Sequence, residues 1–168
     1  MNKSLVLTGM MGVGKSTIGR LLAKRLKIKF VDVDRIIEKN ERKTIKQIFD
    51  ENGETYFRKL EKKITLKLLK NKKVVVALGG GAFINDEIRN KVLKTSVSIW
   101  LKVSLDKLHK RYRRNDKRPL LNKKKLDKEV RNIYLSRKKI YSLADFKINC
   151  DNIDKAKIVE KILYFYEN

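Results

Sequence analysis

The sequence contains one cysteine and one proline in 168 residues. A single thiol, Cys150, excludes an intramolecular disulfide framework and is compatible with a reducing compartment, so we expect a cytoplasmic protein. Apolar runs of about 18 residues, the length needed to cross a bilayer, are also missing, and we therefore expect no transmembrane helix. The first residues, MNKSLVLTGM, lead directly into a predicted strand and lack the pattern of a signal peptide.

Acidic side chains are also scarce, since 19 of them stand against 43 lysines and arginines and leave a net charge of +24. Such an excess is found in nucleic-acid-binding proteins. Here, however, the basic residues are spread through helical stretches such as KLEKKITLKLLKNKK, without interleaved aromatic residues. We expect salt-sensitive, nonspecific adhesion to nucleic acid, but neither a specific nucleic acid nor a membrane as partner.

Short apolar runs alternate with segments of helical periodicity. The predicted strands are Leu5–Thr8, Phe30–Val33, Val74–Leu78, Val97–Leu101 and Phe146–Asn149. The predicted helices are Lys15–Leu26, Thr44–Phe49, Gly53–Leu69, Asp86–Lys94, Leu105–Arg113, Lys125–Ser142 and Asp154–Tyr166. Continuous apolar strands separated by helices are typical of an α/β fold whose parallel sheet is covered on both faces. At this length we expect one domain over residues 1–168, with Trp100 and Phe146 in its core.

Residues 9–17, GMMGVGKST, match the phosphate-loop pattern G-x-x-x-x-G-K-[ST], between a predicted strand and an amphipathic helix. In such a loop the glycines let backbone N–H groups turn toward phosphate oxygens, and the helix N-terminus adds partial positive charge. Lys15 would reach the β- and γ-phosphates, Ser16 would ligate Mg²⁺, and Thr17 would meet the α-phosphate or support the turn. The predicted ATP-binding residues of this loop are Gly12, Val13, Gly14, Lys15, Ser16 and Thr17.

Two aspartates follow in FVDVDRII, where Asp32 and Asp34 are two residues apart on the predicted second strand. That spacing places both carboxylates on one face, at the strand end beside the phosphate loop. One carboxylate can orient Mg²⁺ through water, and the other can take a proton from an acceptor hydroxyl.

The third strand ends in the glycines of VVVALGGGAF, where many nucleotide-hydrolysing folds place an acid that holds magnesium. Glycines there let backbone N–H groups approach a bound acceptor. Gly79 would serve mainly the turn, while Gly80 and Gly81 would face the acceptor. Arginine forks suit a carboxylate, but the residues alone do not distinguish Arg58 and Arg137 from surface arginines.

The missing guanine motif N-K-x-D argues against a GTPase, and the short chain favours a small-molecule phosphotransferase. Three alternatives stay open on these grounds. They are a gluconate kinase, a nucleoside monophosphate kinase and a basic nucleic-acid-binding ATPase.

Several separated motifs resemble those of the shikimate kinase family over essentially the whole chain. They are GMMGVGKST, the D-x-D of VDVDRII, the F-R-x-x-E of YFRKLE, the GGG, the R-P-L-L of DKRPLLN and the R-x-x-x-Y of RKKIYSLAD. The resemblance implies a three-layer P-loop fold with a five-stranded parallel sheet in the order 2-3-1-4-5 and a mobile lid over approximately residues 111–124. It implies a monomer that uses ATP and Mg²⁺ to phosphorylate the 3-hydroxyl of shikimate, in aromatic amino acid biosynthesis.

The resemblance also assigns roles to matching residues. Asp34 would bind the ring hydroxyls and is the candidate base, Asp32 would join the magnesium shell through water, and Glu61 would hold Arg58 in place. The catalytic residues implied are Lys15, Asp34 and Arg118. The shikimate-binding residues implied are Asp34, Phe49, Phe57, Arg58, Gly79, Gly80, Gly81 and Arg137.

Two further ATP contacts come from the resemblance, with Arg118 swinging over the phosphates and Arg111 stacking near the adenine. The family often has a proline where this chain has Lys139, a departure that should leave the carboxylate clamp unchanged. The adenine loop after the fifth strand, NCDNIDK, is weakly patterned in the family, so no adenine-contacting residue is assigned in it. His109 is expected to be a partly exposed helix residue.

Overall fold

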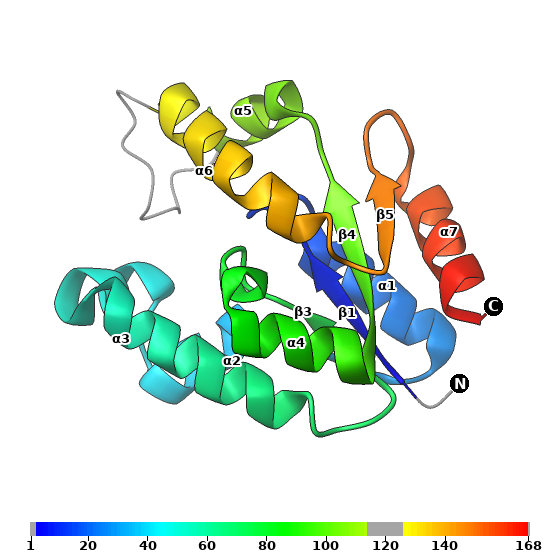
Figure 1. The fold of residues 1–168 in the computed structure, drawn as a ribbon, viewed down its shortest axis with the longest axis horizontal. Coiled ribbons are helices and arrows are strands. Elements are labelled where there is room, and N and C mark those ends of the chain that lie inside the picture. Colours follow the sequence, from blue (N-terminus) through cyan, green and yellow to red (C-terminus); the bar gives the residue numbers. More distant parts are fainter. Residues whose placement is uncertain (1–2, 114–125, 168) are drawn as a thin grey trace.

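The computed structural model describes residues 3–113 and 126–167, and a five-stranded parallel sheet in the order β2-β3-β1-β4-β5 forms its centre (Figure 1). The strands are β1 (Ser4–Thr8), β2 (Lys29–Asp32), β3 (Val74–Ala77), β4 (Ser96–Lys102) and β5 (Phe146–Asn149). The predicted fold class and strand order are confirmed. Because all the strands run in parallel, their carboxyl ends meet at one edge, where α/β proteins bind ligands.

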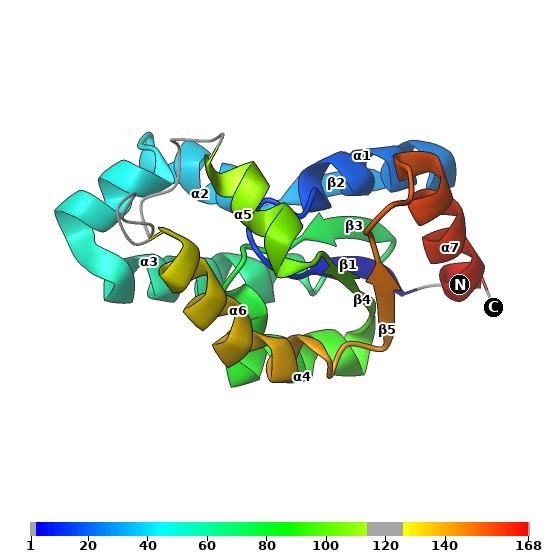
Figure 2. The ribbon, with the colours of Figure 1, turned by 90° about the horizontal axis from the view of Figure 1, so that it is seen from above.

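Helices cover both faces of the sheet and give three layers. They are α1 (Lys15–Leu26), α2 (Val33–Glu41), α3 (Ile45–Leu68), α4 (Asp86–Thr95), α5 (Leu105–Arg113), α6 (Leu126–Tyr141) and α7 (Lys155–Glu167), with a short 3₁₀ turn η1 (Ala82–Ile84). Figures 1 and 2 show α1 and α7 on one face, α4 and α6 on the other, and α2 and α3 extending to one side. In the described part of the chain, no helix combines the length and the apolar character needed to span a bilayer.

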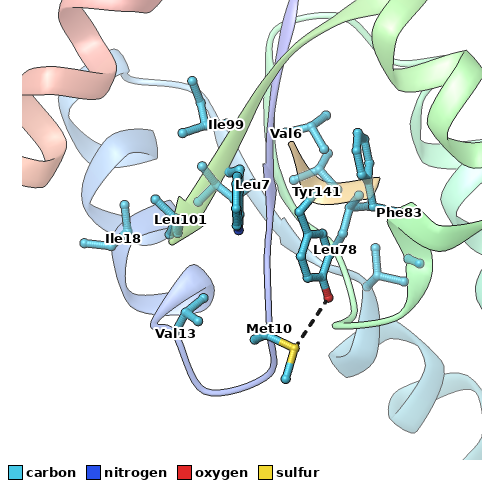
Figure 3. Close-up of a cluster of buried hydrophobic side chains, with 14 of the residues drawn as sticks. Val6, Leu7, Met10, Val13, Ile18, Leu78, Phe83, Ile99, Leu101 and Tyr141 are labelled. Atoms are coloured by element: carbon cyan, nitrogen blue, oxygen red, sulfur yellow. Dashed lines mark hydrogen bonds between the residues drawn. The ribbon is translucent and has the colours of Figure 1, made fainter. Parts of the chain in front are cut away.

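The core lies on both faces of the central strands. Every residue of β1 and β3 is buried, as expected for parallel strands with helices on both sides. Figure 3 shows buried side chains packed around β1, among them Val6 and Leu7 of that strand. Trp100 of β4 is 3% exposed, and its ring lies 6.0 Å from the ring of Tyr141, which is fully buried, at a tilt of 32°. Trp100 also lies under the beginning of the phosphate loop, since a Cβ on Gly9 would come within 3.3 Å of its ring.

Helix α2 was not predicted, and it corrects the assignment of Asp34 to a strand. Strand β2 ends at Asp32, whose carboxylate accepts a hydrogen bond from the Arg35 amide and caps α2. Asp34 therefore lies in the first turn of a helix. The β-branched run obscured the helix, although the four-residue spacing of the buried Val33 and Ile37 is helical.

The predicted helices Thr44–Phe49 and Gly53–Leu69 correspond to the two parts of α3, which has a kink between them. Gly53 has φ 80° and ψ 169°, a conformation that interrupts the helix and suits a residue without Cβ. Thr44 caps the first part in a reciprocal capping box with Gln47. The predicted break was therefore correct. Most of the predicted lid, including Arg118, lies outside the described residues.

Two helices end on non-glycine residues in the left-handed region, and one of these caps generates a stability prediction. Arg42, the exposed C-cap of α2, has φ 53°. We expect Arg42→Gly to raise the free energy of unfolding by about 0.5–1 kcal/mol, because relief of the steric strain outweighs the greater backbone entropy of glycine. Urea unfolding followed by circular dichroism measures the change.

The control is Lys39→Gly at an exposed position inside the same helix, which should lower the free energy of unfolding by about 1 kcal/mol. Destabilisation by both substitutions would contradict the predicted strain at Arg42.

Candidate active site

The phosphate loop joins β1 to α1 at the carboxyl edge of the sheet. Gly12 has φ 72°, and Gly14, the N-cap of α1, has φ 103°. Lys15 is buried, and its Nζ donates hydrogen bonds to the carbonyls of Gly9, at 2.8 Å, and Met10, at 2.9 Å. The two positive φ values and the N-terminus of α1 are features of an anion-binding loop.

The two candidate metal ligands lie together beside this loop. Ser16 Oγ donates a hydrogen bond of 2.5 Å to Asp32 Oδ2, which joins α1 to the end of β2. No group of three or more His, Cys, Asp or Glu side chains arranged to hold a metal ion occurs in residues 3–113 and 126–167. A hydroxyl beside one carboxylate fits Mg²⁺, which keeps most of its water and takes its other ligands from phosphates.

Asp34 and Glu61 turn buried carboxylate oxygens toward the glycine loop after β3. Asp34 Oδ1 and Glu61 Oε1 are buried, and neither has a hydrogen-bond partner in the described structure. Burial, and then the nearby Glu61 carboxylate, raise the pKa of Asp34 to about 6, although the positive charge of Lys15 opposes this shift. Burial likewise raises the pKa of Glu61 against the opposing effect of Arg58. Two such oxygens are suited to hydroxyl groups of a ligand, because each lacks a donor within the protein.

Arg58 is held in place from two sides on α3. Its Nη1 is 2.7 Å from Glu61 Oε2, while its Nη2 is 3.0 Å and its Nε 3.1 Å from Glu54 Oε1. The guanidinium also lies 5.2 Å from the centroid of the Phe57 ring, and that ring packs 4.7 Å from Phe49 across the kink in α3. The predicted contact between Glu61 and Arg58 is present. Glu54 was not predicted, although its position four residues before Arg58 on the helix indicates the contact.

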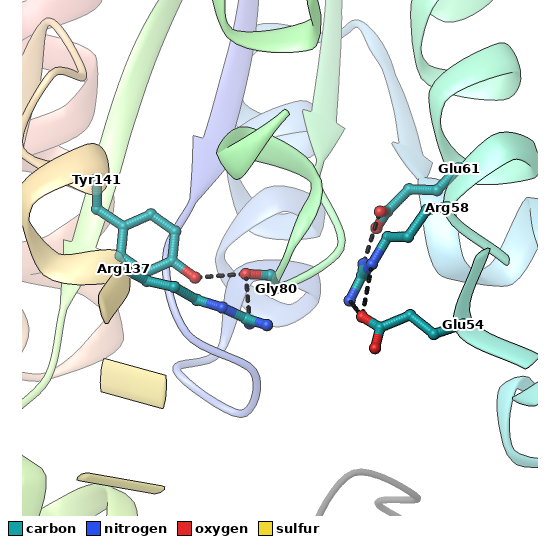
Figure 4. Close-up of polar contacts among 6 residues, drawn as sticks. All are labelled: Glu54, Arg58, Glu61, Gly80, Arg137 and Tyr141. Atoms are coloured by element: carbon teal, nitrogen blue, oxygen red, sulfur yellow. Dashed lines mark hydrogen bonds and ion pairs between the residues drawn. The ribbon is translucent and has the colours of Figure 1, made fainter. Parts of the chain in front are cut away.

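Arg137 approaches the glycine loop from the opposite side. Its Nη1 donates a 3.1 Å hydrogen bond to the carbonyl of Gly80, and the Tyr141 hydroxyl donates to the same oxygen. Figure 4 shows the guanidinium groups of Arg58 and Arg137 on either side of this loop. Burial raises the pKa of Tyr141 to about 12, so its hydroxyl stays a donor. No role was predicted for Tyr141, but its place one helical turn after Arg137 indicates the shared partner.

Each glycine of the tripeptide leaves room for a different neighbour. A Cβ on Gly79 would lie 2.3 Å from Glu61 Oε1 and 2.7 Å from Asp34 Oδ1, and one on Gly81 would lie 2.5 Å from Arg58 Nη1. A Cβ on Gly80 would lie 3.0 Å from the amide nitrogen of Met11 in the phosphate loop. The interpretation that Gly79 serves mainly the turn is therefore incomplete, because its lack of a side chain admits the two carboxylates.

The remaining candidates lie around the phosphate loop or on α5. Arg111 Nη1 donates a 2.9 Å hydrogen bond to the carbonyl of Gly12. His109 is partly buried on the same helix, and its Nδ1 lies 3.6 Å from Asp127 Oδ1 of α6. Arg118 is the one predicted site residue outside the described residues, while the others meet around the two loops.

Comparisons with known proteins agree with this geometry. The family model for shikimate kinase matches residues 11–167. A shikimate kinase from Persephonella marina is 43% identical over 161 residues, which cover 96% of this chain and 97% of that protein. The structure of a shikimate kinase from Acinetobacter baumannii in complex with shikimate has a TM-score of 0.93 at 30% identity, over 98% of this chain and 92% of that one. A gluconokinase from Sinorhizobium meliloti, at 16% identity and a TM-score of 0.58 over 99% of this chain and 98% of that one, shares the fold alone.

The two anchors of Arg58 should differ in their contribution to stability. The Glu61 side chain is 3% exposed and that of Glu54 is 57% exposed. We expect Glu61→Ala to lower the free energy of unfolding by about 2–4 kcal/mol, because it leaves a half-buried guanidinium without its buried partner. The matched substitution Glu54→Ala should cost less than about 1 kcal/mol, as exposed ion pairs do. Urea unfolding of both variants measures the difference, and equal losses would contradict it.

Proposed function

The chain belongs to the shikimate kinase family, and from this premise we propose that it transfers the γ-phosphoryl group of ATP to the 3-hydroxyl of shikimate, in aromatic amino acid biosynthesis. The observation that carries the proposal is the acceptor side of the site. Two guanidinium groups and two unpartnered carboxylate oxygens surround one glycine loop beside the phosphate loop. That arrangement suits a small polyhydroxylated ring that carries a carboxylate.

The phosphates of ATP would bind to the N–H groups of Gly12 to Thr17, with Lys15 neutralising their charge. Lys15 Nζ now donates to two loop carbonyls, so it needs only a local change to reach a phosphate oxygen. Mg²⁺ would be held by Ser16 and, through water, by Asp32, and would supply charge neutralisation at the phosphates. Arg111 and Arg118 would complete the nucleotide contacts, at the adenine and the phosphates respectively.

The carboxylate of shikimate would lie between Arg58 and Arg137, with the ring against Phe49 and Phe57. Gly79, Gly80 and Gly81 would form the floor beneath the ring. Asp34 would hold the 3-hydroxyl in line with the γ-phosphorus and accept its proton, since a carboxylate with a pKa of about 6 is largely ionised at neutral pH. Phosphoryl transfer passes through a loose transition state, so catalysis consists mainly of positioning and charge neutralisation by Lys15, Mg²⁺ and Arg118.

The acceptor side also favours this function over the other kinases of the fold. A nucleoside monophosphate kinase would need a base-binding pocket and more arginines around a phosphate, whereas the carboxylates of Asp34 and Glu61 lie where an added phosphate would be repelled.

The cytoplasm is the compartment we propose, because ATP is available there and the free thiol of Cys150 stays reduced. We also propose a monomer, because the exposed apolar side chains of the described structure are scattered over α1, α3, α6 and α7 and form no single patch.

The function is tested by measuring ADP release with shikimate, gluconate, nucleoside monophosphates or nucleic acid offered separately as acceptors. We expect turnover to require Mg²⁺ and to rise only with shikimate. A chain that releases no more ADP with shikimate than without any acceptor would overturn the proposal.

The role of Asp34 generates a prediction on turnover. Asp34→Asn keeps the size of the side chain but removes the negative charge and the proton acceptor. The turnover number should fall about 10²–10⁴-fold, while the affinity for ADP, measured by calorimetry, stays within about twofold. Asp86→Asn on the exposed first turn of α4 is the control and should leave turnover unchanged. Retention of more than about a tenth of the rate by Asp34→Asn would contradict the proposed base.

The glycine floor generates a prediction that separates the two substrates. In Gly81→Ala the new methyl group would displace the guanidinium of Arg58, so the KM for shikimate should rise at least about tenfold and the KM for ATP less than twofold. In Gly80→Ala the methyl group would press on the phosphate-loop backbone at Met11, so both KM values should rise. Steady-state kinetics with each substrate varied in turn measures both KM values. Equal changes of the KM values in the two variants would contradict the assigned contacts.

A further inference from the structure

The carbonyl groups at the beginning of the phosphate loop all accept hydrogen bonds from side chains. Lys15 Nζ donates to the carbonyls of Gly9 and Met10. The next two carbonyls are bound from a distant part of the chain, since the Tyr112 hydroxyl donates to Met11 and Arg111 Nη1 donates to Gly12. Helix α5 therefore holds the part of the loop that Lys15 does not reach.

These carbonyls matter because the N–H and C=O of one peptide unit point in opposite directions. Because the Tyr112 hydroxyl binds the Met11 carbonyl on one side of this peptide unit, the amide of Gly12 points to the other side. This peptide unit needs an external restraint, since Gly12, at φ 72°, has no Cβ and adopts positive and negative φ with similar ease. A rotated unit would present an oxygen to the phosphates instead of an N–H group.

Tyr112 is better suited to this restraint than its neighbour Arg111. The Tyr112 side chain is 3% exposed and belongs to the hydrophobic core, so its hydroxyl has a fixed position. Arg111 is exposed and has a flexible side chain that is free to turn toward a nucleotide. The buried phenol is therefore the more rigidly held of the two donors to the loop.

We propose that Tyr112 is a positioning residue of the phosphate loop, whose hydroxyl holds the Met11 carbonyl outward and thereby presents the Gly12 amide to the nucleotide phosphates. This inference rests on the proposed function only for the identity of the nucleotide. Tyr112 would touch neither substrate and would act on the nucleotide side alone. Tyr141 has the corresponding contact on the acceptor side, where its hydroxyl binds the carbonyl of Gly80.

The test is Tyr112→Phe, which removes one hydroxyl and keeps the buried ring. Calorimetry with ADP and Mg²⁺, without shikimate, should give a Kd about 3–10-fold above that of the unmodified chain, as the loss of one backbone-directed hydrogen bond predicts. The KM for ATP should rise by a similar factor, while the KM for shikimate stays within about twofold.

Tyr166→Phe is the matched control. Tyr166 is 6% exposed, and its hydroxyl donates a 2.6 Å hydrogen bond to the carbonyl of Lys3, away from the candidate active site. Both variants should lose similar thermal stability, but only Tyr112→Phe should lose affinity for ADP. An unchanged Kd for Tyr112→Phe, or KM values that rise equally for both substrates, would overturn the proposal.

A direct readout of the loop strengthens the test. The chain has eight glycines, so ¹⁵N-glycine labelling gives a small set of amide signals. Addition of ADP should shift the Gly12 signal in the unmodified chain and in Tyr166→Phe, and shift it less in Tyr112→Phe. An equal shift in Tyr112→Phe would overturn the inference even if shikimate proved to be the wrong acceptor, because the readout needs no phosphoryl transfer.

Discussion

The site depends on the close approach of four structural elements to the glycines after β3. The carboxylates of Asp34 and Glu61 lie against Gly79, the phosphate loop against Gly80, and the guanidinium of Arg58 against Gly81. Any side chain on this loop would separate groups that the proposed function brings to one ligand. The carbonyl of Gly80 accepts hydrogen bonds from Arg137 and Tyr141 of α6, so this helix also fixes the loop.

Burial and charge are balanced in this arrangement. Glu61 faces Arg58 with one oxygen and the glycine loop with the other, which leaves a buried acceptor available beside Asp34. Desolvation raises the pKa of both carboxylates, and positive charges oppose this shift, Lys15 at Asp34 and the two arginines at Glu61. The same positive groups are the ones that would meet a carboxylate and a triphosphate, so one set of charges stabilises the protein and attracts its ligands.

Much of the architecture was predictable because it follows from periodicity and from one specific motif. The alternation of apolar runs and helices predicted the parallel sheet, and GMMGVGKST predicted a phosphate-binding loop between β1 and α1. Helix α2 was not predicted because Asp32, its cap, lies between two valines, Val31 of the strand and Val33 of the helix, and the alternation VDVD is typical of a strand. The approach of two carboxylates to Gly79 and the contact of Tyr112 with the phosphate loop could not be predicted, since each joins segments far apart in the sequence.

The position of Trp100 is relevant to fluorescence measurements on this protein. It is the only tryptophan in the sequence, and it lies beside Gly9 of the phosphate loop and next to the ring of Tyr141, whose hydroxyl donates to the Gly80 carbonyl. Gly9 therefore connects the indole to the phosphate loop, and Tyr141 connects it to the glycine loop after β3. The single indole of the protein therefore lies between the phosphate loop and the glycine loop, where its fluorescence is expected to respond to changes in either loop without an added label.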